Sequence, residues 1–422
     1  MNKPNRNTPN RKRSDVRSPA SDFRSRTSDL GNPTSDLGPP ISEIIDLIRS
    51  LFEQPEGTIP LHAPIFNGNE RKYVLDAIDS TFVSSVGKYV DRFEEMLTDI
   101  TGAEYAVATV NGTAALQVAL QLAGVQSGDE VMTQPLTFVA TCNAISHCGA
   151  KPAFVDIDSE TVGLSPNSLE NFLQKHCKFQ DGNTINRNTG NRIAACVPMH
   201  TFGHPCRIEE ICKVCDRYNI PVVEDAAEAL GSTRNGKQAG TFGKLGIYSF
   251  NGNKTVTCGG GGAIVTNDES LAKHAKHITT TAKVPHPYEY VHDEVAYNYR
   301  MPNLNAALAC AQLEMLDTYI ANKRRTAKAY ADFFDAFESI DFLKEPENCH
   351  SNYWLNSLVF ESKAVRDKFL KQMNDNRIMA RAAWRLMPDL EIFRNCQNDN
   401  LQTAQTLQPC LANIPSSVNE KQ

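Results

Sequence analysis

Short β-branched runs alternate with longer amphipathic stretches between residues 106 and 267, and this rhythm constrains the fold more than any other feature of the chain. Helical stretches such as Ala114–Ala123, Val139–Cys148 and Ile208–Tyr218 separate most of the runs, and the Asn- and Gly-rich interruption from Phe179 to Arg192 is expected to be an exposed loop. Such alternation is typical of a mainly parallel sheet with helices on both faces. The sequence therefore predicts an α/β fold around a mainly parallel seven-stranded sheet. Its strands are expected at Ala106–Val110, Glu130–Gln134, Ala153–Ile157, Ile193–Met199, Val222–Asp225, Gly246–Phe250 and Ala263–Thr266.

The composition excludes several other classes of protein. The 422 residues are 41% hydrophobic and 22% charged, with a formal net charge of −6. These values are those of an ordinary globular protein and not of a collagen, a coiled coil or a wholly disordered chain. No apolar run reaches the roughly 18 residues of a membrane span, and the N-terminus lacks the apolar core of a secretory signal. We expect a cytoplasmic protein.

The first forty residues differ from the rest of the chain. They carry eight Lys and Arg residues, four Asp residues and six prolines, but few large apolar side chains. Such a segment buries too little apolar surface to offset the entropy of ordering it. The interspersed aspartates argue against a nucleic-acid arm or a transit peptide. The sequence therefore predicts a disordered tail over residues 1–40.

Two of the twelve cysteines have CxxC spacing. Cys212 and Cys215 follow two nearby histidines, so a zinc site is one interpretation. However, the same run has apolar residues at helical spacing, and the cysteines also fit the buried face of a helix. The sequence has no second CxxC pair. We therefore expect core packing, no metal site and reduced thiols.

A turn that can bind an anion follows the first predicted strand. Asn111-Gly112-Thr113 leads directly into an Ala-rich helix. The free backbone N–H groups and the hydroxyl at such a helix start form a natural anion cradle. The alternative is a simple helix cap.

Two further loops carry charged residues at predicted strand ends. Asp225 and Glu228 lie at the end of Val222–Asp225, where a carboxylate can bind a ligand or cap the next helix. Lys254 lies between an apolar strand and the glycine run Gly259–Gly262. A lysine in a loop over a pocket would have a lowered pKa, because burial and nearby cations disfavour the ammonium. The alternative is a solvated loop lysine.

Together these parts match the needs of pyridoxal 5′-phosphate. This cofactor requires a phosphate cradle, a carboxylate that keeps its pyridine nitrogen protonated, and a lysine that binds it covalently. Phe138, in the loop after the second strand, is then available to stack on the ring. Burial of Phe138 in the core is the alternative.

Ordered stretches from about Pro60 to the C-terminus carry a family resemblance. They are Val86–Val90 with Phe93-Glu94, Asn111–Leu116, Gly128–Val131, Thr137–Ala140, Phe154–Ile157, Glu224–Ala227, Ser249-Phe250 with Lys254, and Asn298–Met301. On these motifs the chain resembles the DegT/DnrJ/EryC1/StrS family of sugar aminotransferases, which have the aspartate aminotransferase fold (fold type I). The sequence from about Leu304 predicts a long helical stretch through Phe334, a strand at Leu355–Phe360 and a helix around Ala364–Asn374, which is the pattern of a smaller α/β domain. We therefore expect a large cofactor-binding domain at residues 41–303 and a small C-terminal domain at residues 304–422.

The resemblance assigns the chemistry to three residues. Lys254 would be attached to the cofactor and would then move the proton between the substrate carbon and the cofactor. Asp225 would bind the pyridine nitrogen. Glu228 would lie beside the ring hydroxyl, where many family members have Gln or His. A carboxylate there must be protonated or turned away, unless a cation offsets the repulsion.

The remaining cofactor contacts are also implied by the resemblance. Gly112, Thr113 and Ser249 would hold the phosphate, and Phe138 would stack on the ring. Asn298 would reach the phosphate of the neighbouring subunit's cofactor. That assignment implies an obligate homodimer with shared active sites.

Three stretches resemble the LegC-type subgroup: Ser249–Lys254 with its four glycines, Asn352–Asn356, and Ile378–Arg381 with Trp384. These enzymes aminate the 4-keto group of a UDP-linked 2-acetamido-2,6-dideoxy-hexosulose on the route to legionaminic acid and related sugars. Arg381 would contact the nucleotide sugar, or would be a charge on a helix surface. His200 would face the substrate, or would be a satisfied structural histidine.

The implied reaction is a transamination in two halves. An amino acid, which we expect to be glutamate, gives its amine to the cofactor, and the amine then passes to the 4-keto sugar. We expect no nucleic-acid or membrane partner. The alternatives are a dehydratase of the same fold, in which histidine replaces the lysine, and a non-catalytic regulator. Lys254, together with Asp225 and Ser249, argues against both.

Overall fold

The computed structural model describes residues 39–419. The predicted tail lies outside this range except for its last two prolines, and it stays a prediction. Strands form at each of the seven predicted positions. They are β1 (Tyr105–Thr109), β2 (Glu130–Thr133), β3 (Lys151–Phe154), β6 (Ile193–Val197), β7 (Val223–Asp225), β10 (Leu245–Ser249) and β11 (Gly262–Thr266).

These strands form two adjoining sheets. The first has the order β1-β11-β10-β7 and the second the order β3-β2-β6, and the parallel bridges Cys196–Val222 and Met199–Asp225 link β6 to β7. β10 is parallel to β7, but β11 is antiparallel to both of its neighbours. The α/β class is thus confirmed. The prediction of one mainly parallel seven-stranded sheet is not confirmed, because the seven strands form two sheets and β11 is antiparallel.

The reversal of β11 follows from the connection that precedes it. A parallel partner requires a crossover of a dozen or more residues, usually with a helix. The segment between β10 and β11 contains no helix, and the chain turns back with Ser249 opposite Gly262. Because β7 and β10 are parallel, this turn, which carries Lys254, lies at the sheet edge where Asp225 ends β7.

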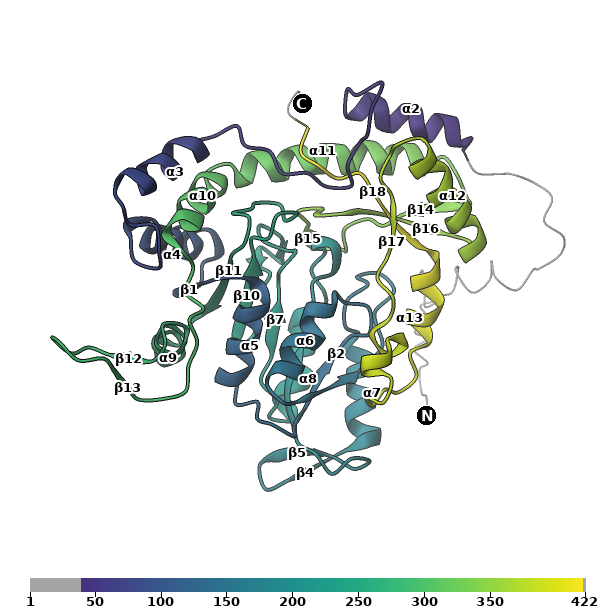
Figure 1. The fold of residues 1–422 in the computed structure, drawn as a ribbon. Helices are drawn as coiled ribbons and strands as arrows, with labels where there is room; N and C mark the ends of the chain where they lie inside the picture. The colour runs from purple at the N-terminus through teal and green to yellow at the C-terminus, as the bar shows by residue number, and fades with distance from the viewer. Residues whose placement is uncertain (1–38, 420–422) are drawn as a thin grey trace, which may run out of the picture. The chain divides into compact units, whose positions relative to one another are not determined.

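The central strands are buried on both faces. Ile247 of β10 packs with residues of α5 (Gly112–Leu122) and α6 (Val139–His147), which lie in front of the strands in Figure 1. The next residue, Tyr248, packs instead with residues of α4 (Lys88–Thr101) and α10 (Asn303–Leu313). This period of two is that of a strand covered by helices on both sides, as the sequence predicted.

The CxxC pair lies on α8 (Ile208–Arg217), which begins and ends close to its predicted bounds. Cys215 is fully buried beside Ile211 in an apolar cluster, and Cys212 is half-buried. The core-packing interpretation predicts this environment. Three more helices complete this part of the chain: α3 (Glu70–Asp79), α7 (Pro166–His176) and α9 (Glu269–Thr279).

Two hairpins extend from the sheets. The stretch 179–192, predicted as an exposed loop, includes part of a hairpin of β4 (Cys177–Gln180) and β5 (Asn183–Asn186). Its turn residues Asp181 and Gly182 both have positive φ, the conformation favoured in two-residue hairpins, so the loop prediction was wrong here. The second hairpin, β12 (Lys283–Val284) with β13 (Val291–His292), projects away from the strands in Figure 1.

The C-terminal residues build another sheet, in the order β14-β16-β18-β17. The long helix predicted through Phe334 is interrupted after α10, and α11 (Leu316–Phe334) follows. Ile44 and Ile48 of α2 (Ile41–Leu51) pack in the core of this sheet, and the division into domains 41–303 and 304–422 stays a prediction. The other elements here are β14 (Ile340–Phe342), β16 (Asn356–Phe360), α12 (Lys363–Asp375), β17 (Arg381–Ala382), α13 (Gln402–Leu407) and β18 (Leu411–Ile414).

Three short strands also form a small sheet in the order β15-β8-β9: β8 (Thr233–Arg234), β9 (Lys237–Gln238) and β15 (Cys349–His350). Between residues 39 and 419, no helix combines the length and the apolar character needed to cross a membrane.

Candidate active site

Lys254 lies in the turn after β10, and its side chain is only 12% exposed. Its backbone N–H donates to the Asn251 carbonyl, which closes the turn. The ammonium lies 3.3 Å from Glu228 Oε1 and 4.1 Å from the centroid of the Trp354 ring. This environment is that of a buried functional amine and not of a solvated loop lysine.

Glu228 is the anionic partner of Lys254. It is 3% exposed, and its second oxygen accepts a hydrogen bond from the Phe202 N–H at 3.0 Å. Burial raises the pKa of Glu228 to about 7, and the nearby Lys254 charge opposes that rise. Lys254 is therefore a cation beside the Glu228 carboxyl, which is one of the arrangements that the sequence left open.

Asp225 ends β7 and is buried. Its Oδ2 accepts a hydrogen bond from the Thr141 hydroxyl at 2.8 Å, and its Oδ1 accepts one from the Ala227 N–H at 3.1 Å. These two donors fix the carboxylate at the sheet edge, where it can hold a positive group. No role was predicted for Thr141. Its place one helical turn after Phe138 on α6 was the available signal.

The helix start at Gly112 approaches the end of β10 closely. Asn111 caps α5 by accepting a hydrogen bond from the Ala114 N–H at 2.8 Å. A Cβ added at Gly112 would lie 2.9 Å from Ser249 Cβ, so only glycine fits here. The first N–H groups of a helix have no partner within it. The Ser249 hydroxyl adjoins this helix start, since its oxygen would lie 3.2 Å from a Cβ on Gly112, and Thr113 directly follows Gly112. The predicted phosphate residues are thus close together.

A group of three aromatic side chains lies beside Glu228. Phe138 is 47% exposed, which does not fit the alternative of core burial. Its ring centroid is 6.1 Å from that of Trp384, which is 5.2 Å from that of Phe202. Phe202 in turn donates its N–H to Glu228, so the group reaches the charged pair. Only the subgroup resemblance indicated Trp384, and no sequence pattern indicated Phe202.

His200 has the geometry of a structural histidine. It is fully buried, its Nδ1 accepts a hydrogen bond from the Cys206 N–H, and its Nε2 lies 2.9 Å from Glu224 Oε2. Because Nδ1 accepts, Nε2 carries the proton that it donates to Glu224. Both ring nitrogens are therefore engaged within the chain, which favours the structural alternative over a substrate contact.

Arg381 and Asn298 have their described contacts with residues outside this group. Arg381 is exposed on β17 and donates to Asn374 Oδ1 at 3.3 Å. Asn298 is exposed, and its backbone bridges to Thr280. Among residues 39–419, neither side chain has a hydrogen bond or ion pair with Lys254. Their predicted substrate and partner-subunit roles stay predictions.

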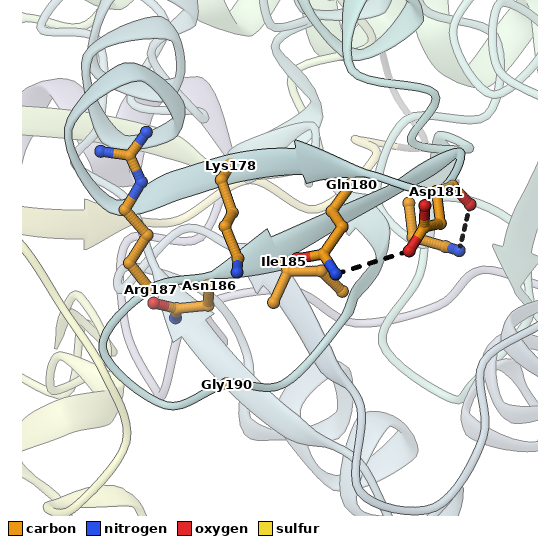
Figure 2. A pocket seen from close by; sticks show the side chains of 8 residues that line it. Lys178, Gln180, Asp181, Ile185, Asn186, Arg187 and Gly190 are labelled. Atoms are coloured by element: carbon orange, nitrogen blue, oxygen red, sulfur yellow. Dashed lines mark hydrogen bonds between the residues drawn. The ribbon is translucent and has the colours of Figure 1, made fainter.

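The pocket in Figure 2 lies elsewhere, on the β4–β5 hairpin. It has a volume of about 470 Å³, and its lining includes Lys178, Gln180 and Arg187. The figure shows Gln180 donating a hydrogen bond to Asp181 within the same hairpin. The predicted site residues do not line this pocket.

The residues at the sheet edge fit pyridoxal 5′-phosphate. The cradle at Gly112 matches its phosphate, the fixed Asp225 carboxylate its pyridine nitrogen, and the buried Lys254 its aldehyde. Fold and site together define the class, a pyridoxal phosphate-dependent aminotransferase. A model of the DegT/DnrJ/EryC1/StrS aminotransferase family matches residues 64–421, and the chain belongs to this family.

Individual proteins are similar to this chain in sequence or in fold. The GDP-perosamine synthase of Escherichia coli O157:H7 is 36% identical over 323 residues, which are 76% of this chain and 84% of that protein. The structure of DesI in the presence of its TDP-sugar product has a TM-score of 0.75 at 25% identity, and the match covers 87% and 90% of the two chains. The PLP form of Spr1654 from Streptococcus pneumoniae has a TM-score of 0.76 at 23% identity, with 87% and 95% covered.

Proposed function

We propose that this enzyme transfers an amine, from glutamate, to the 4-keto group of a nucleotide-linked 6-deoxy sugar. The observation that carries the proposal is the buried pair of Lys254 and Glu228 at the sheet edge that also holds Asp225. An amine buried beside a proton acceptor is what proton transfer at a substrate carbon requires.

When bound, pyridoxal 5′-phosphate supplies an electron-accepting ring that lets an amine leave one carbon and join another. Lys254 must lose a proton before its Nζ can act as a base. Glu228 lies 3.3 Å away, and its pKa of about 7 is close to the working pH, so it can take that proton and return it. Asp225, fixed by Thr141, would stabilise positive charge at the pyridine nitrogen.

Phe138 and Trp384 would exclude water from this chemistry. Their rings lie beside Phe202, whose N–H holds Glu228 in place. A side chain as exposed as Phe138 is available to cover a bound ring.

The proposal also concerns the nucleotide to which the sugar is linked. The motifs of the LegC-type subgroup favour a UDP-linked 2-acetamido sugar on a route to legionaminic acid or a related surface glycan. The name GDP-perosamine synthase instead gives a GDP-linked product for the relative from Escherichia coli. We propose the 4-keto-6-deoxy sugar as the shared substrate class. Arg381 is the candidate contact for the diphosphate.

We also propose a homodimer with shared active sites and fold type I for each subunit. Exposed apolar side chains are gathered on α3 and the segment after it, and an apolar surface of this kind is typical of subunit contacts. The members are Leu75, Ile78, Phe82, Val83 and Val86, each at least 45% exposed. The exposed Asn298 would reach the neighbouring cofactor's phosphate.

A panel of GDP-linked and UDP-linked 4-keto-6-deoxy sugars, incubated with the holoenzyme and glutamate, tests the proposal. The product mass should show exchange of the keto oxygen for an amine, with 2-oxoglutarate released in equal amount. Loss of a sugar hydroxyl without 2-oxoglutarate would instead indicate a dehydratase. No conversion of any sugar, with glutamate left unchanged, would indicate a non-catalytic regulator.

A further inference from the structure

A second cluster of ligand-type side chains lies where the β12–β13 hairpin returns to α9. His277 belongs to the last turn of α9, and Asp293 and Glu294 directly follow β13. His277 Nε2 is 2.6 Å from Asp293 Oδ1 and 3.7 Å from Glu294 Oε1. Within the described part of the chain, these three residues form the one group whose potential metal-ligand atoms all lie within 4.8 Å of one another.

His274 extends this cluster. It lies one turn before His277 on α9, and its Nε2 is 3.0 and 3.3 Å from the two oxygens of Glu294. Glu294 Oε1 therefore faces both imidazole rings. A carboxylate only accepts, so each imidazole nitrogen must carry a proton in these contacts. A cation between the four groups would replace those protons and bind the lone pairs directly.

We propose that His274, His277, Asp293 and Glu294 bind a divalent transition metal ion of the zinc type. Two imidazoles and two carboxylates are ligands that zinc accepts in tetrahedral sites, at about 2.0–2.2 Å from the metal. Neighbouring ligand atoms in such a tetrahedron are roughly 3.4 Å apart. The separations of 2.6 and 3.7 Å within the group of His277, Asp293 and Glu294 lie on either side of this value. His274 lies outside that group but is 3.0 Å from Glu294, so its ring must move further than the other three side chains to complete the site. Magnesium and calcium prefer all-oxygen sites and fit less well.

The metal would fasten a hairpin that has little apolar anchorage. Tyr288 and Tyr290 are each 84% exposed, and Val295 is 96% exposed. At the root of the hairpin, where β12 and β13 join the rest of the chain, the Asp293 N–H donates a backbone hydrogen bond to the Ala282 carbonyl at 3.3 Å. Asn298 lies four residues after Glu294, so an ordered root would also order Asn298. This last consequence rests on the proposed role of Asn298 in the dimer.

Zinc binding to the full-length holoenzyme, after removal of metals with a chelator, tests the site directly. Equilibrium dialysis should show one tightly bound zinc ion per chain, and His277→Ala should weaken its binding at least about tenfold. His286→Ala, on the same hairpin but outside the cluster, is the matched control and should bind as the parent does. The proposal is overturned if zinc does not bind at micromolar concentration, or if both variants bind like the parent.

Cobalt substitution identifies the ligands without any turnover. The visible bands should be those of tetrahedral coordination by nitrogen and oxygen, whereas a thiolate charge-transfer band would place the metal on the cysteines and overturn the proposal. Zinc should also slow chymotrypsin cleavage at Tyr288 and Tyr290 in the parent but not in Glu294→Gln. Neither readout depends on substrate, so this site and the aminotransferase proposal can fail separately.

Discussion

Lys254 and Glu228 form a largely buried ion pair, with 3.3 Å between Nζ and Oε1. Removal of these two charges from water is costly unless they stay paired. Their burial therefore indicates that the pair serves chemistry more than stability. The first two predictions follow from it.

The cofactor-free protein should lose stability as the pH rises through the titration of Glu228. The pKa of this carboxyl is raised from 4.5 to about 7, so the folded chain holds the proton more tightly. Its contribution to the free energy of unfolding is complete below about pH 4.5 and is lost by about pH 7. The loss is on the order of 3 kcal/mol. Urea unfolding at several pH values should show this loss in the parent and not in Glu228→Gln. If the free energy of unfolding changes equally with pH in both proteins, the raised pKa does not belong to Glu228.

Lys254→Ala should abolish transamination, because the amine acts in the chemistry and not in packing. We expect at least about a thousandfold loss of kcat, measured as 2-oxoglutarate release. The exposed Lys371→Ala on α12 is the control and should behave as the parent. The far-ultraviolet circular dichroism of both variants should match the parent, and residual activity near the parent level would remove Lys254 from its role.

Asp225→Asn should slow the reaction strongly, since a neutral amide cannot hold the positive pyridine nitrogen. Thr141→Val removes only the hydroxyl that donates to Asp225 Oδ2. Loss of such a charge-assisted hydrogen bond costs about 1.5–3 kcal/mol, so an intermediate loss of kcat is expected. Single-turnover rates with glutamate measure both effects. Thr141→Val at the parent rate would show that the hydroxyl does not position Asp225.

Gly112→Ala should destabilise the protein and weaken cofactor binding, because its Cβ would lie 2.9 Å from Ser249 Cβ. Overpacking of this kind costs about 1–3 kcal/mol. In the double variant with Ser249→Gly, the overlap is removed and the thermal stability should recover. Gly252→Ala, where no atom lies within 4 Å, is the control. A melting temperature for Gly112→Ala equal to that of the control would contradict the close approach.

Much of the fold and of the site could be predicted from local pattern. The strand positions follow from β-branched runs, and the helix start at Gly112 from its turn chemistry. The antiparallel direction of β11 was not predicted. It follows from the absence of a crossover helix before β11, whereas the alternation of residues along a strand does not depend on the direction of its neighbours. The interruption after α10 was missed because both flanking stretches have the same helical period.

Side-chain partners were less predictable than positions. The pairing of Glu228 with Lys254 joins two residues that lie far apart on the chain, and that of His200 with Glu224 joins neighbouring parallel strands. The sequence separation of neither pair belongs to a known motif, so the sequence favoured neither a structural role nor a substrate contact for His200. Only the register of β6 and β7 decides which carboxylate it meets.

Borohydride reduction of the holoenzyme, followed by peptide mapping, tests the central assignment most directly. The reagent fixes the cofactor on the amine that holds it, and the peptide with Lys254 should carry the pyridoxyl group in stoichiometric amount. A pyridoxyl group on any other lysine, or on none, would contradict the assignment of Lys254.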